Sequence, residues 1–300
     1  MATTFDNTTN YSGKFAGEYI KAAFQANDSL QYLTVKENIE YKAVVKRIGG
    51  ELAFSDATCA FTPNNTVNLS ERYLTLKKLQ LPLELCINEL LTDYTSKDIQ
   101  MGKLNGDMEN AILTWLLEGI AATNESHIWV GNGATAGQYD GLLKLIEADS
   151  DGDVNFITPA TITTTNIFAE IQKVINAMPL AVKQSAEKPL LYMSQDVWEI
   201  FMYANAAAGN GWYTYTGPEV PKTFMGLYNI AVVAGLPANT MVMARKSNLW
   251  FGTNVLSDWN NIVIKNMQEF GEDNIRINAK FFAGTQYGIG SEIVAYSTWF

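Results

Sequence analysis

The sequence has few of the residues on which most enzyme chemistry depends. Its 300 residues include one histidine, His127, and two cysteines, Cys59 and Cys86. Any Ser-His or Cys-His mechanism would have to use that one histidine, and a metal site with several histidine ligands is excluded. Two cysteines are too few for a disulfide framework, so buried free thiols are expected. We therefore predict that the chain is not an enzyme and has no catalytic, cofactor-binding or metal-binding residues.

Long apolar runs and dense basic clusters are also missing. No apolar run approaches the roughly 20 residues that a membrane span requires. The first residues, MATTFDNTTNYSG, lack the basic start and apolar centre of a signal peptide. The formal net charge is −10, which repels nucleic-acid phosphates. These features predict no membrane segment, no sequence-specific binding of nucleic acid, and synthesis in the cytoplasm.

Glycine is concentrated in one segment, WVGNGATAGQYDGLL, at residues 129–143. Closely spaced glycines can form a phosphate-binding loop, as in the dinucleotide fingerprint G-x-G-x-x-G. Here the third glycine is one residue late, at Gly137, and the loop follows a helical pattern where the fingerprint requires a strand. The segment therefore does not predict a nucleotide site.

A second tempting motif is the acidic turn DSDGDVN at 149–155. Asp149, Asp151 and Asp153 occupy positions one, three and five of a calcium-binding loop. The glycine comes two residues early, however, and Ala160 stands at position twelve, where a bidentate glutamate is needed. We interpret the segment as a solvated acidic turn.

Residues 35–85 are predicted to form one long β excursion. Apolar and polar residues alternate from Val35 to Ile48, Gly49 and Gly50 interrupt the pattern, and Tyr73 to Leu85 returns as an extended, leucine-rich segment. Two strands joined in this way are marginal in water without a further packing surface. That surface is either the later strands of the same chain or a neighbouring copy of the protein, and the local sequence leaves both open.

The rest of the chain alternates helical and extended patterns. Apolar residues recur every three or four positions from about 105 to 126, which predicts a long central helix. Residues 159–258 read as a compact α/β region with helices starting near Asn166 and Ser194. Alternation from Asn274 to Phe281 predicts a strand, and 288–298 is expected to return as its antiparallel partner. The fold class is therefore α+β.

Taken together, these segments resemble a known family. An N-terminal arm, a long β excursion, a spine helix, the segment IWVGNGATAGQYDGLL, an inserted α/β region and closing long strands resemble the major capsid protein of tailed bacteriophages, the Hong Kong 97 fold. The segment FMGLYNIAVVAGLPANTMVMARKSNLWFG at 224–252 is similar to a stretch of that family's axial domain. Two positions depart from the family pattern: Tyr139-Asp140 replaces a frequent proline, and Thr253 replaces an aspartate.

The resemblance implies a division of the chain. Residues 1–34 would be the arm and 35–85 an extended loop that overlies an adjacent subunit. Residues 86–158 and 259–300 would form the peripheral domain, with the spine helix near 105–126, and 159–258 the axial domain. The glycines of the segment quoted above would form a structural hinge between the spine helix and the peripheral domain: Gly131, Gly133, Gly137 and Gly141.

The resemblance also implies a structural function without an active site. Copies would assemble through pentamers and hexamers into an icosahedral phage head, a virion capsid built in the host bacterial cytoplasm around double-stranded DNA that is enclosed without sequence-specific binding. The expected partners are further copies of the chain, a separate scaffold, a portal and decoration proteins. The candidate inter-subunit loop contains six named residues: Lys46, Arg47, Gly49, Gly50, Pro63 and Asn64.

Two other functions stay open at this level. An encapsulin, the shell of a bacterial nanocompartment, shares the fold that the resemblance implies. A monomeric carbohydrate-binding module is suggested by the aromatic segment GNGWYTYTG at 209–217, whose rings would stack on sugars. The capsid interpretation accounts for the whole chain, whereas the carbohydrate interpretation accounts for one loop.

Overall fold

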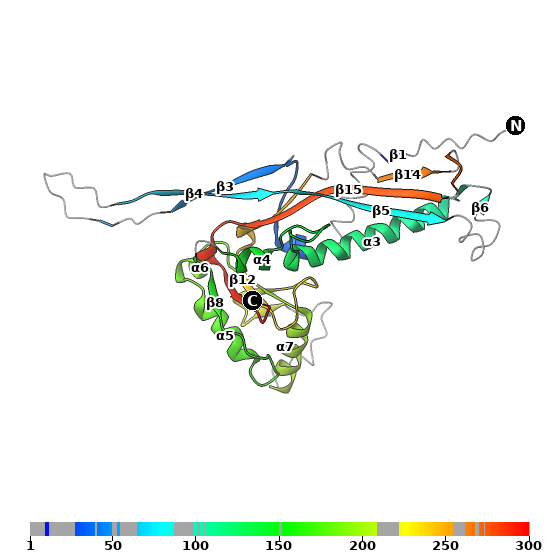
Figure 1. Cartoon of the computed structure of the whole chain (residues 1–300). Helices are drawn as coiled ribbons and strands as arrows, with labels where there is room; N and C mark the ends of the chain where they lie inside the picture. Colours follow the sequence, from blue (N-terminus) through cyan, green and yellow to red (C-terminus); the bar gives the residue numbers. More distant parts are fainter. Residues whose placement is uncertain are drawn as a thin grey trace.

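The computed structural model shows a long rod of strands and one helix above a rounder lobe (Figure 1). The structure describes these residues: 10–11, 28–39, 41–49, 53–54, 65–86, 99–100, 103–104, 106–149, 152–208, 222–254, 262–267, 270–272 and 274–299. Most of the predicted arm and the aromatic segment 209–217 lie outside them.

The first sheet forms the rod. Its longest strand is β15 (Asn274–Tyr287), which pairs antiparallel with β5 (Lys77–Cys86), β13 (Leu249–Thr253) and β14 (Ile262–Asn266). Two short strands complete it: β1 (Asn10–Tyr11) on β14, and β2 (Thr34–Lys36) parallel to β13. Buried and less buried residues alternate along the first half of β15, as the period-two sequence predicts.

The spine helix, α3 (Gly106–Val130), runs along this sheet (Figure 1). Its buried residues recur at the predicted spacing and pack with Leu79 of β5 and with Ile277 and Phe281 of β15: Leu113, Leu116 and Ile120. The short helix α4 (Leu142–Glu147) follows the glycine-rich loop and adds Leu142, Leu143 and Ile146 to the same core. Within the described residues, no helix is long and apolar enough to cross a membrane.

The second sheet lies in the lobe, in the order β10-β11-β9-β12-β16-β8. Its strands are β8 (Asn155–Ile157), β9 (Leu190–Met193), β10 (Thr223–Phe224), β11 (Tyr228–Val232), β12 (Met241–Ala244) and β16 (Val294–Tyr296). Helices α5 (Ile167–Ala177) and α7 (Gln195–Ala207) pack on it through a separate apolar cluster, and α6 (Leu180–Gln184) joins α5 to β9. Both longer helices begin where the sequence predicts, directly after Asn166 and Ser194.

The predicted closing hairpin is wrong. The chain after β15 turns through a 3₁₀ helix, η5 (Gly290–Glu292), and its last strand, β16, pairs antiparallel with β12 and parallel with β8. Residues 293–296 are all buried, so this strand is covered on both faces and does not alternate. The backbone of β16 pairs with two strands of the second sheet, and its apolar side chains pack into the two apolar clusters. The partners of β15 are instead β5, β13 and β14.

The β excursion consists of two parts with different supports. Strands β2 and β5 at its base belong to the first sheet, so this part rests on the same chain. Its outer part is a two-stranded hairpin, β3 (Lys42–Gly49) paired with β4 (Asn68–Thr75), which projects beyond the rest of the molecule (Figure 1). Two shorter strands, β6 (Ile99–Gln100) and β7 (Lys103–Leu104), pair separately just before α3.

Candidate assembly surface

One face of the projecting hairpin is both apolar and exposed. Val44 of β3 lies opposite Tyr73 of β4, and alternation places Leu69 on the same face. Their exposed fractions are 48%, 46% and 76%. All three side chains are about half exposed or more, although a two-stranded hairpin of this kind is marginal in water by itself. We call this set, Val44, Leu69 and Tyr73, the outer face.

Charged side chains alternate with the apolar ones on the outer face. The ammonium group of Lys42 lies 3.7 Å from the centre of the Tyr73 ring, and the Tyr73 hydroxyl donates to Glu71 at 3.3 Å. Lys46 lies directly opposite Glu71 in the strand register, between the Val44–Tyr73 pair and Leu69. A protein partner that covered this face would bury apolar side chains and pair with charged ones, as partners do at protein–protein interfaces.

The opposite face of the hairpin is anchored to the first sheet. Leu74 and Leu76 are buried together with Ile39, and Ala43 and Trp250 pack against them. Ile39 and Ala43 thus contribute to this packing, whereas Tyr41 between them is 67% exposed.

Two glycines make this anchor possible. Gly252 of β13 and Gly284 of β15 are directly paired, and the chain that links β4 to β5 lies on them. A Cβ atom at Gly284 would lie 2.4 Å from the carbonyl oxygen of Thr75, and one at Gly252 would lie 2.8 Å from the side-chain methyl groups of Leu74 and Leu76. Only residues without a side chain allow the hairpin base to approach this closely.

The glycine-rich loop lies beside the anchor. The Lys77 ammonium group donates to the carbonyl oxygens of Gly133 at 2.7 Å and of Thr135 at 3.2 Å. A Cβ atom at Gly131 would lie 2.3 Å from the Tyr139 carbonyl oxygen, and one at Gly141 would lie 2.6 Å from the Gly131 nitrogen. The loop is therefore closed on itself at its two ends.

The other glycines serve different needs. Gly137 has φ +79°, a left-handed conformation that favours glycine. The N–H of Gly133 donates to the Asp140 carboxylate at 2.8 Å, and the N–H of Asn132 donates to the Gln138 side chain at 3.0 Å. Because these N–H groups already have acceptors within the loop, they are not arranged to hold a phosphate.

Asp149 connects the hairpin, the sheet and the acidic turn. Its side chain, 2% exposed, accepts hydrogen bonds from the Tyr287 hydroxyl, from Arg72 of β4 and from the backbone N–H groups of Asp153 and Val154. Burial alone would raise the pKa of this carboxyl, but these hydrogen bonds outweigh it and lower the pKa below 3.8. The carboxylate is a structural acceptor, and no group of three or more possible metal ligands occurs among the described residues.

A second buried carboxylate holds the spine helix to the lobe. Glu125 of α3 is 7% exposed and accepts from the backbone N–H and hydroxyl of Ser29 and from the N–H of Gly235. Burial raises the pKa of Glu125, partly offset by these hydrogen bonds. His127, two residues further along α3, has a pKa lowered by burial and meets Tyr139 edge-on at 6.0 Å. The single histidine thus packs near the end of the helix.

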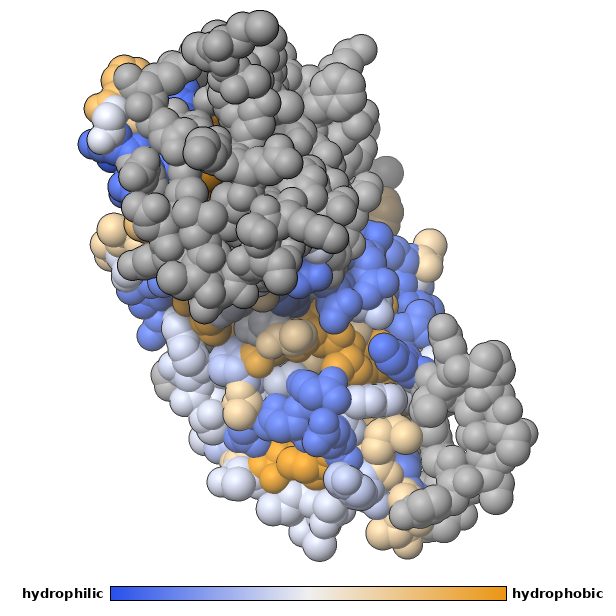
Figure 2. Space-filling model, turned by 90° about the vertical axis from the view of Figure 1, so that its right-hand side faces the viewer, coloured by the Kyte–Doolittle hydropathy of each residue, from blue (hydrophilic) through white to orange (hydrophobic). Residues whose placement is uncertain are grey.

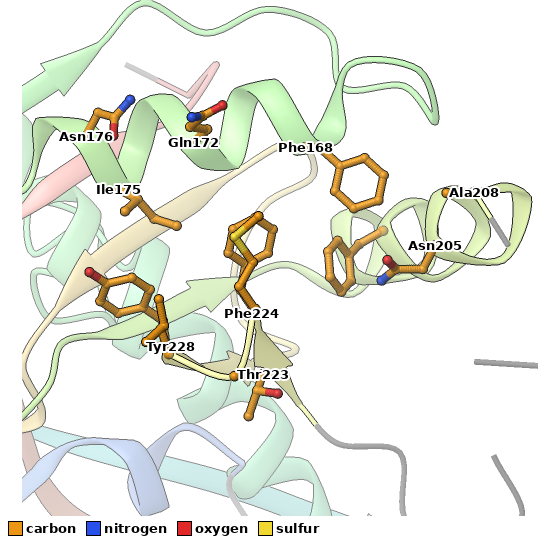
Figure 3. Close-up of a pocket in the computed structure, with 13 residues that line it drawn as sticks. Phe168, Gln172, Ile175, Asn176, Asn205, Ala208, Thr223, Phe224 and Tyr228 are labelled. Carbon is orange, nitrogen blue, oxygen red and sulfur yellow. The ribbon is translucent and has the colours of Figure 1, made fainter. Parts of the chain in front are cut away.

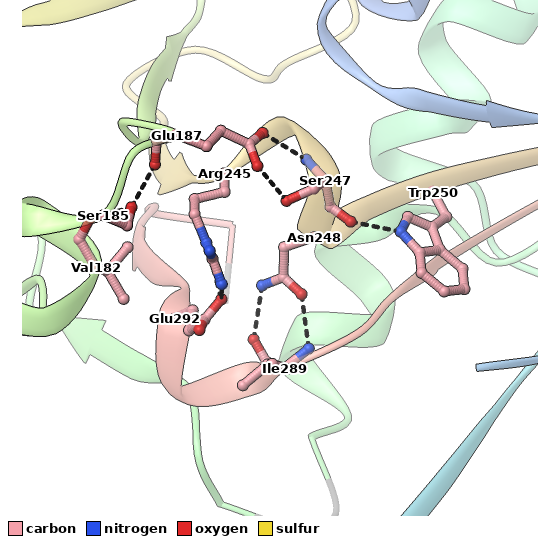
Figure 4. A network of polar contacts seen from close by, with 9 residues as sticks. All are labelled: Val182, Ser185, Glu187, Arg245, Ser247, Asn248, Trp250, Ile289 and Glu292. Carbon is pink, nitrogen blue, oxygen red and sulfur yellow. Dashed lines mark hydrogen bonds and ion pairs between the residues drawn. The ribbon is translucent and has the colours of Figure 1, made fainter. Parts of the chain in front are cut away.

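A polar network fixes the place where the chain passes between the two sheets (Figure 4). Asn248 precedes β13 and bonds both the N–H and the carbonyl oxygen of Ile289, which follows β15. Arg245 forms an ion pair with Glu292, and the Glu187 carboxylate accepts from Ser247. Residues 245–248 lead from the second sheet to the first, and residues 289–292 lead back. The two segments are therefore bound to each other, which couples the rod to the lobe.

The named residues of the candidate inter-subunit loop are only partly described. Lys46 is exposed on β3, and the backbones of Arg47 and Gly49 continue that strand opposite Ser70 and Asn68. The other three lie outside the described residues: Gly50, Pro63 and Asn64. Sequence reasoning missed the outer face, although the alternation that places Lys42 and Lys46 outward also carries Val44 outward.

Comparison with known proteins gives one consistent result. No protein-family model matches the chain, and no curated protein matches its sequence. Among solved structures, the capsid of Myoviridae phage XM1 is similar with a TM-score of 0.60 and 9% identity, over 89% of this chain and 90% of that one. A capsid of an empty GTA particle gives a TM-score of 0.58 and 13% identity, over 91% and 90%. A virus-like particle from Pyrococcus furiosus gives 0.55 and 14%, over 93% and 96%.

The chain has the Hong Kong 97 capsid fold. The similarity extends over about nine-tenths of both chains in each comparison, so it includes the rod and the lobe together. At 9–14% identity this similarity shows a common fold alone.

Proposed function

We propose that the protein is a major capsid protein, the structural subunit of a phage-type shell. The observation that carries this proposal is the projecting hairpin, whose base is fixed to its own chain while the apolar side chains of its outer face are 46–76% exposed. A neighbouring copy covers them. The similarity to the capsids of Myoviridae phage XM1 and of an empty GTA particle supports the same function.

Within this proposal the division of the chain follows the expected segments. Residues 1–34 form the arm, 35–85 the extended loop, 86–158 with 259–300 the peripheral domain, and 159–258 the axial domain. The sheets cross these limits, because β8 and β16 pair within the second sheet and β13 pairs within the first. The chain therefore ties the peripheral and axial domains together more than once.

The glycine loop acts in this proposal as a structural hinge. Gly131 and Gly141 allow the chain to double back after the spine helix, and Lys77 fastens the loop to the first strand after the hairpin. The hinge thus positions the hairpin base relative to α3. Because the hairpin then has the same orientation in every copy, it can contact the same surface on each neighbour. A closed ring requires this, since the same interface recurs between successive subunits.

Assembly then follows from many modest contacts. Copies join through pentamers and hexamers into an icosahedral shell, and because each subunit touches several neighbours, contacts that are weak singly act together. The net charge of −10 suits a shell that encloses DNA without adhering to it. The proposed partners are a scaffold, a portal and decoration proteins, and the shell is built in the host cytoplasm.

An encapsulin-type compartment is the second candidate. The observation in its favour is that a virus-like particle from Pyrococcus furiosus is among the similar structures, with more than nine-tenths of both chains covered. Both candidates are shells, and they differ in cargo. Shells produced together with the neighbouring genes would contain DNA in the first case and an enzyme in the second.

The test is negative-stain electron microscopy of the purified protein, with light scattering to give its mass in solution. Closed shells, or rings of five and six subunits, are the expected result. If the purified protein alone stays monomeric, it is co-expressed with a scaffold from the same gene neighbourhood. A protein that stays monomeric under both conditions contradicts the proposal and favours the carbohydrate-binding module.

A further inference from the structure

A cavity of about 720 Å³ opens in the lobe, between α5, α7 and the turn that joins β10 to β11 (Figure 3). Its inner wall is aromatic. Phe201 and Phe224 are buried with ring centroids 6.1 Å apart, and Phe168 meets Phe201 edge-on at 5.8 Å. Sites for small organic molecules typically measure roughly 300–1,000 Å³ and are lined in this way.

The turn at the mouth of the cavity carries an unusual residue. Met225 has φ +51° and Gly226 φ +67°, and the N–H of Leu227 donates to the carbonyl oxygen of Phe224 at 3.0 Å, the geometry of a type I′ turn. Asn, Asp and Gly suit the first position of such a turn, because positive φ is unfavourable for other side chains. The chain instead has methionine there, a pliable apolar side chain that is 82% exposed.

Exposed apolar groups continue around the mouth. Leu227 is 69% exposed beside Met225, and Ile175 of α5 is half-buried at the cavity edge. Seen end-on, the described surface of the lobe has its hydrophobic residues in separate patches among hydrophilic ones (Figure 2). At the cavity mouth, by contrast, apolar side chains are continuous with an aromatic interior, which is the arrangement of a binding site.

The lining also restricts the charge of the ligand. Among the described residues that line the cavity there is no Asp, Glu, Lys, Arg or His. Its polar groups are neutral: the amides of Gln172 and Asn176, one turn apart on α5, the amide of Asn205 on α7, and the hydroxyl groups of Thr223 and Tyr228. A charged ligand would lose water here without gaining a counter-charge, which is costly.

We propose that this cavity binds a neutral small molecule with an aromatic or aliphatic body and one hydrogen-bonding group. The body lies against Phe201 and Phe224, Met225 closes over it, and the polar group reaches the amides of Gln172 or Asn176. Because the ligand contacts α5, α7 and the β10–β11 turn at once, it stabilises the folded lobe, and the stabilisation rises with the logarithm of its concentration once that exceeds the dissociation constant. The site is independent of shell assembly.

Three probes with the same ring test the charge requirement on the purified full-length protein: naphthalen-1-ylmethanol, which is neutral, 1-naphthoate, an anion, and 1-naphthylmethylammonium, a cation. Calorimetry and thermal melting are measured with each. We expect the alcohol to raise the melting temperature and to bind about tenfold more tightly than either ion, because only the ions must be desolvated without a partner. Equal binding of the three, or no binding of the alcohol at millimolar concentration, overturns the proposal.

A pair of substitutions tests the location. Met225→Asn should keep or raise the melting temperature, because asparagine tolerates positive φ, and should weaken binding of the alcohol about fivefold by removing the apolar closure. Leu180→Asn is the matched control, since Leu180 is 66% exposed outside the cavity lining, and it should leave binding unchanged. Equal effects of the two substitutions contradict the site. If assembled shells exclude the alcohol and Met225→Asn impairs assembly, a second copy fills the cavity and the small-molecule assignment is wrong.

Discussion

Replacing Gly284 by alanine should tilt the hairpin on the first sheet. Gly284 and Gly252 form a flat platform on β15 and β13, and the chain between β4 and β5 lies on it. A Cβ atom at Gly284 would lie 2.4 Å from the Thr75 carbonyl oxygen and 3.3 Å from a Leu76 methyl group. The closest obstacle is backbone, which cannot rotate aside, so the hairpin base itself has to move.

The size of the movement follows from the geometry. An ordinary contact begins at 3.4 Å, so Thr75 must rise by about 1 Å from its present 2.4 Å. Leu74 and Leu76 hold the base over about 7 Å of strand, and a rise of about 1 Å over that length is a tilt of about 8°. The eight residues of β4 span about 27 Å, so the far end is displaced by about 4 Å. Overpacking of this kind costs about 1–3 kcal/mol.

Two other alanine substitutions complete the series. Gly252→Ala should cost less, because the nearest atoms to its Cβ are side-chain methyl groups, of Leu74, Leu76 and Ile39, which can rotate. Gly119→Ala is the control: it lies on the exposed side of α3 with nothing within 4 Å, and alanine should stabilise the helix by up to about 1 kcal/mol. Urea unfolding gives the stability of each variant, and light scattering gives the protein concentration at which shells form.

We expect Gly284→Ala to remain folded with near-native circular dichroism, to lose stability and to form shells only at higher concentration. Gly119→Ala should assemble like the unaltered protein. The reasoning is refuted if Gly284→Ala assembles at the unaltered concentration, or if Gly252→Ala is the more damaging of the two platform substitutions.

Three further predictions concern the hairpin and the Asp149 carboxylate. Deleting residues 49–67 should leave a folded subunit that no longer assembles; unfolding of the deletion variant, seen by circular dichroism, would mean that the excursion supports its own chain. Asp149→Asn should lower the free energy of unfolding at neutral pH. Because the folded pKa of Asp149 lies below 3.8, its ionised form stabilises the fold above pH 3.8, and the stability is lost as pH falls through the lowered pKa. Urea unfolding across this range should therefore show the two proteins converging in acid, and a constant difference would contradict the assignment. Calcium should produce no heat and no shift in melting temperature, since Asp149 already accepts bonds from Arg72 and Tyr287; a clear binding isotherm would show that the turn is a metal site.

Much of the fold follows from local patterns in the sequence. The apolar repeat of α3, the alternation along β15 and the starts of α5 and α7 are each set by neighbours within a few residues, so the sequence alone predicts them. The end of α3 was predicted four residues early, near 126, although Gly131 just after Val130 is the residue whose missing Cβ lets the chain turn.

The errors concern partners that are far apart in the sequence. Residues 294–296 show no alternation, because both faces of β16 are buried, so nothing local identifies β12 and β8 as its neighbours. The anchor pairs Gly252 with Gly284. The segment AGTQYG, residues 283–288, instead reads as the turn of the closing hairpin, whereas β15 continues through it to Tyr287. Val44 and Tyr73 similarly become one surface only when the register of β3 and β4 is known.

The position of β16 has a consequence for truncated copies of the chain. This strand is the last in the described chain, yet it lies between β12 and β8 in the interior of the second sheet. A polypeptide that stops before residue 294 contains every other strand but leaves two edges open and the apolar residues around Tyr296 uncovered. Truncated products of translation therefore cannot complete the lobe. In the proposed shell, such a copy would reach its neighbours with an incomplete lobe.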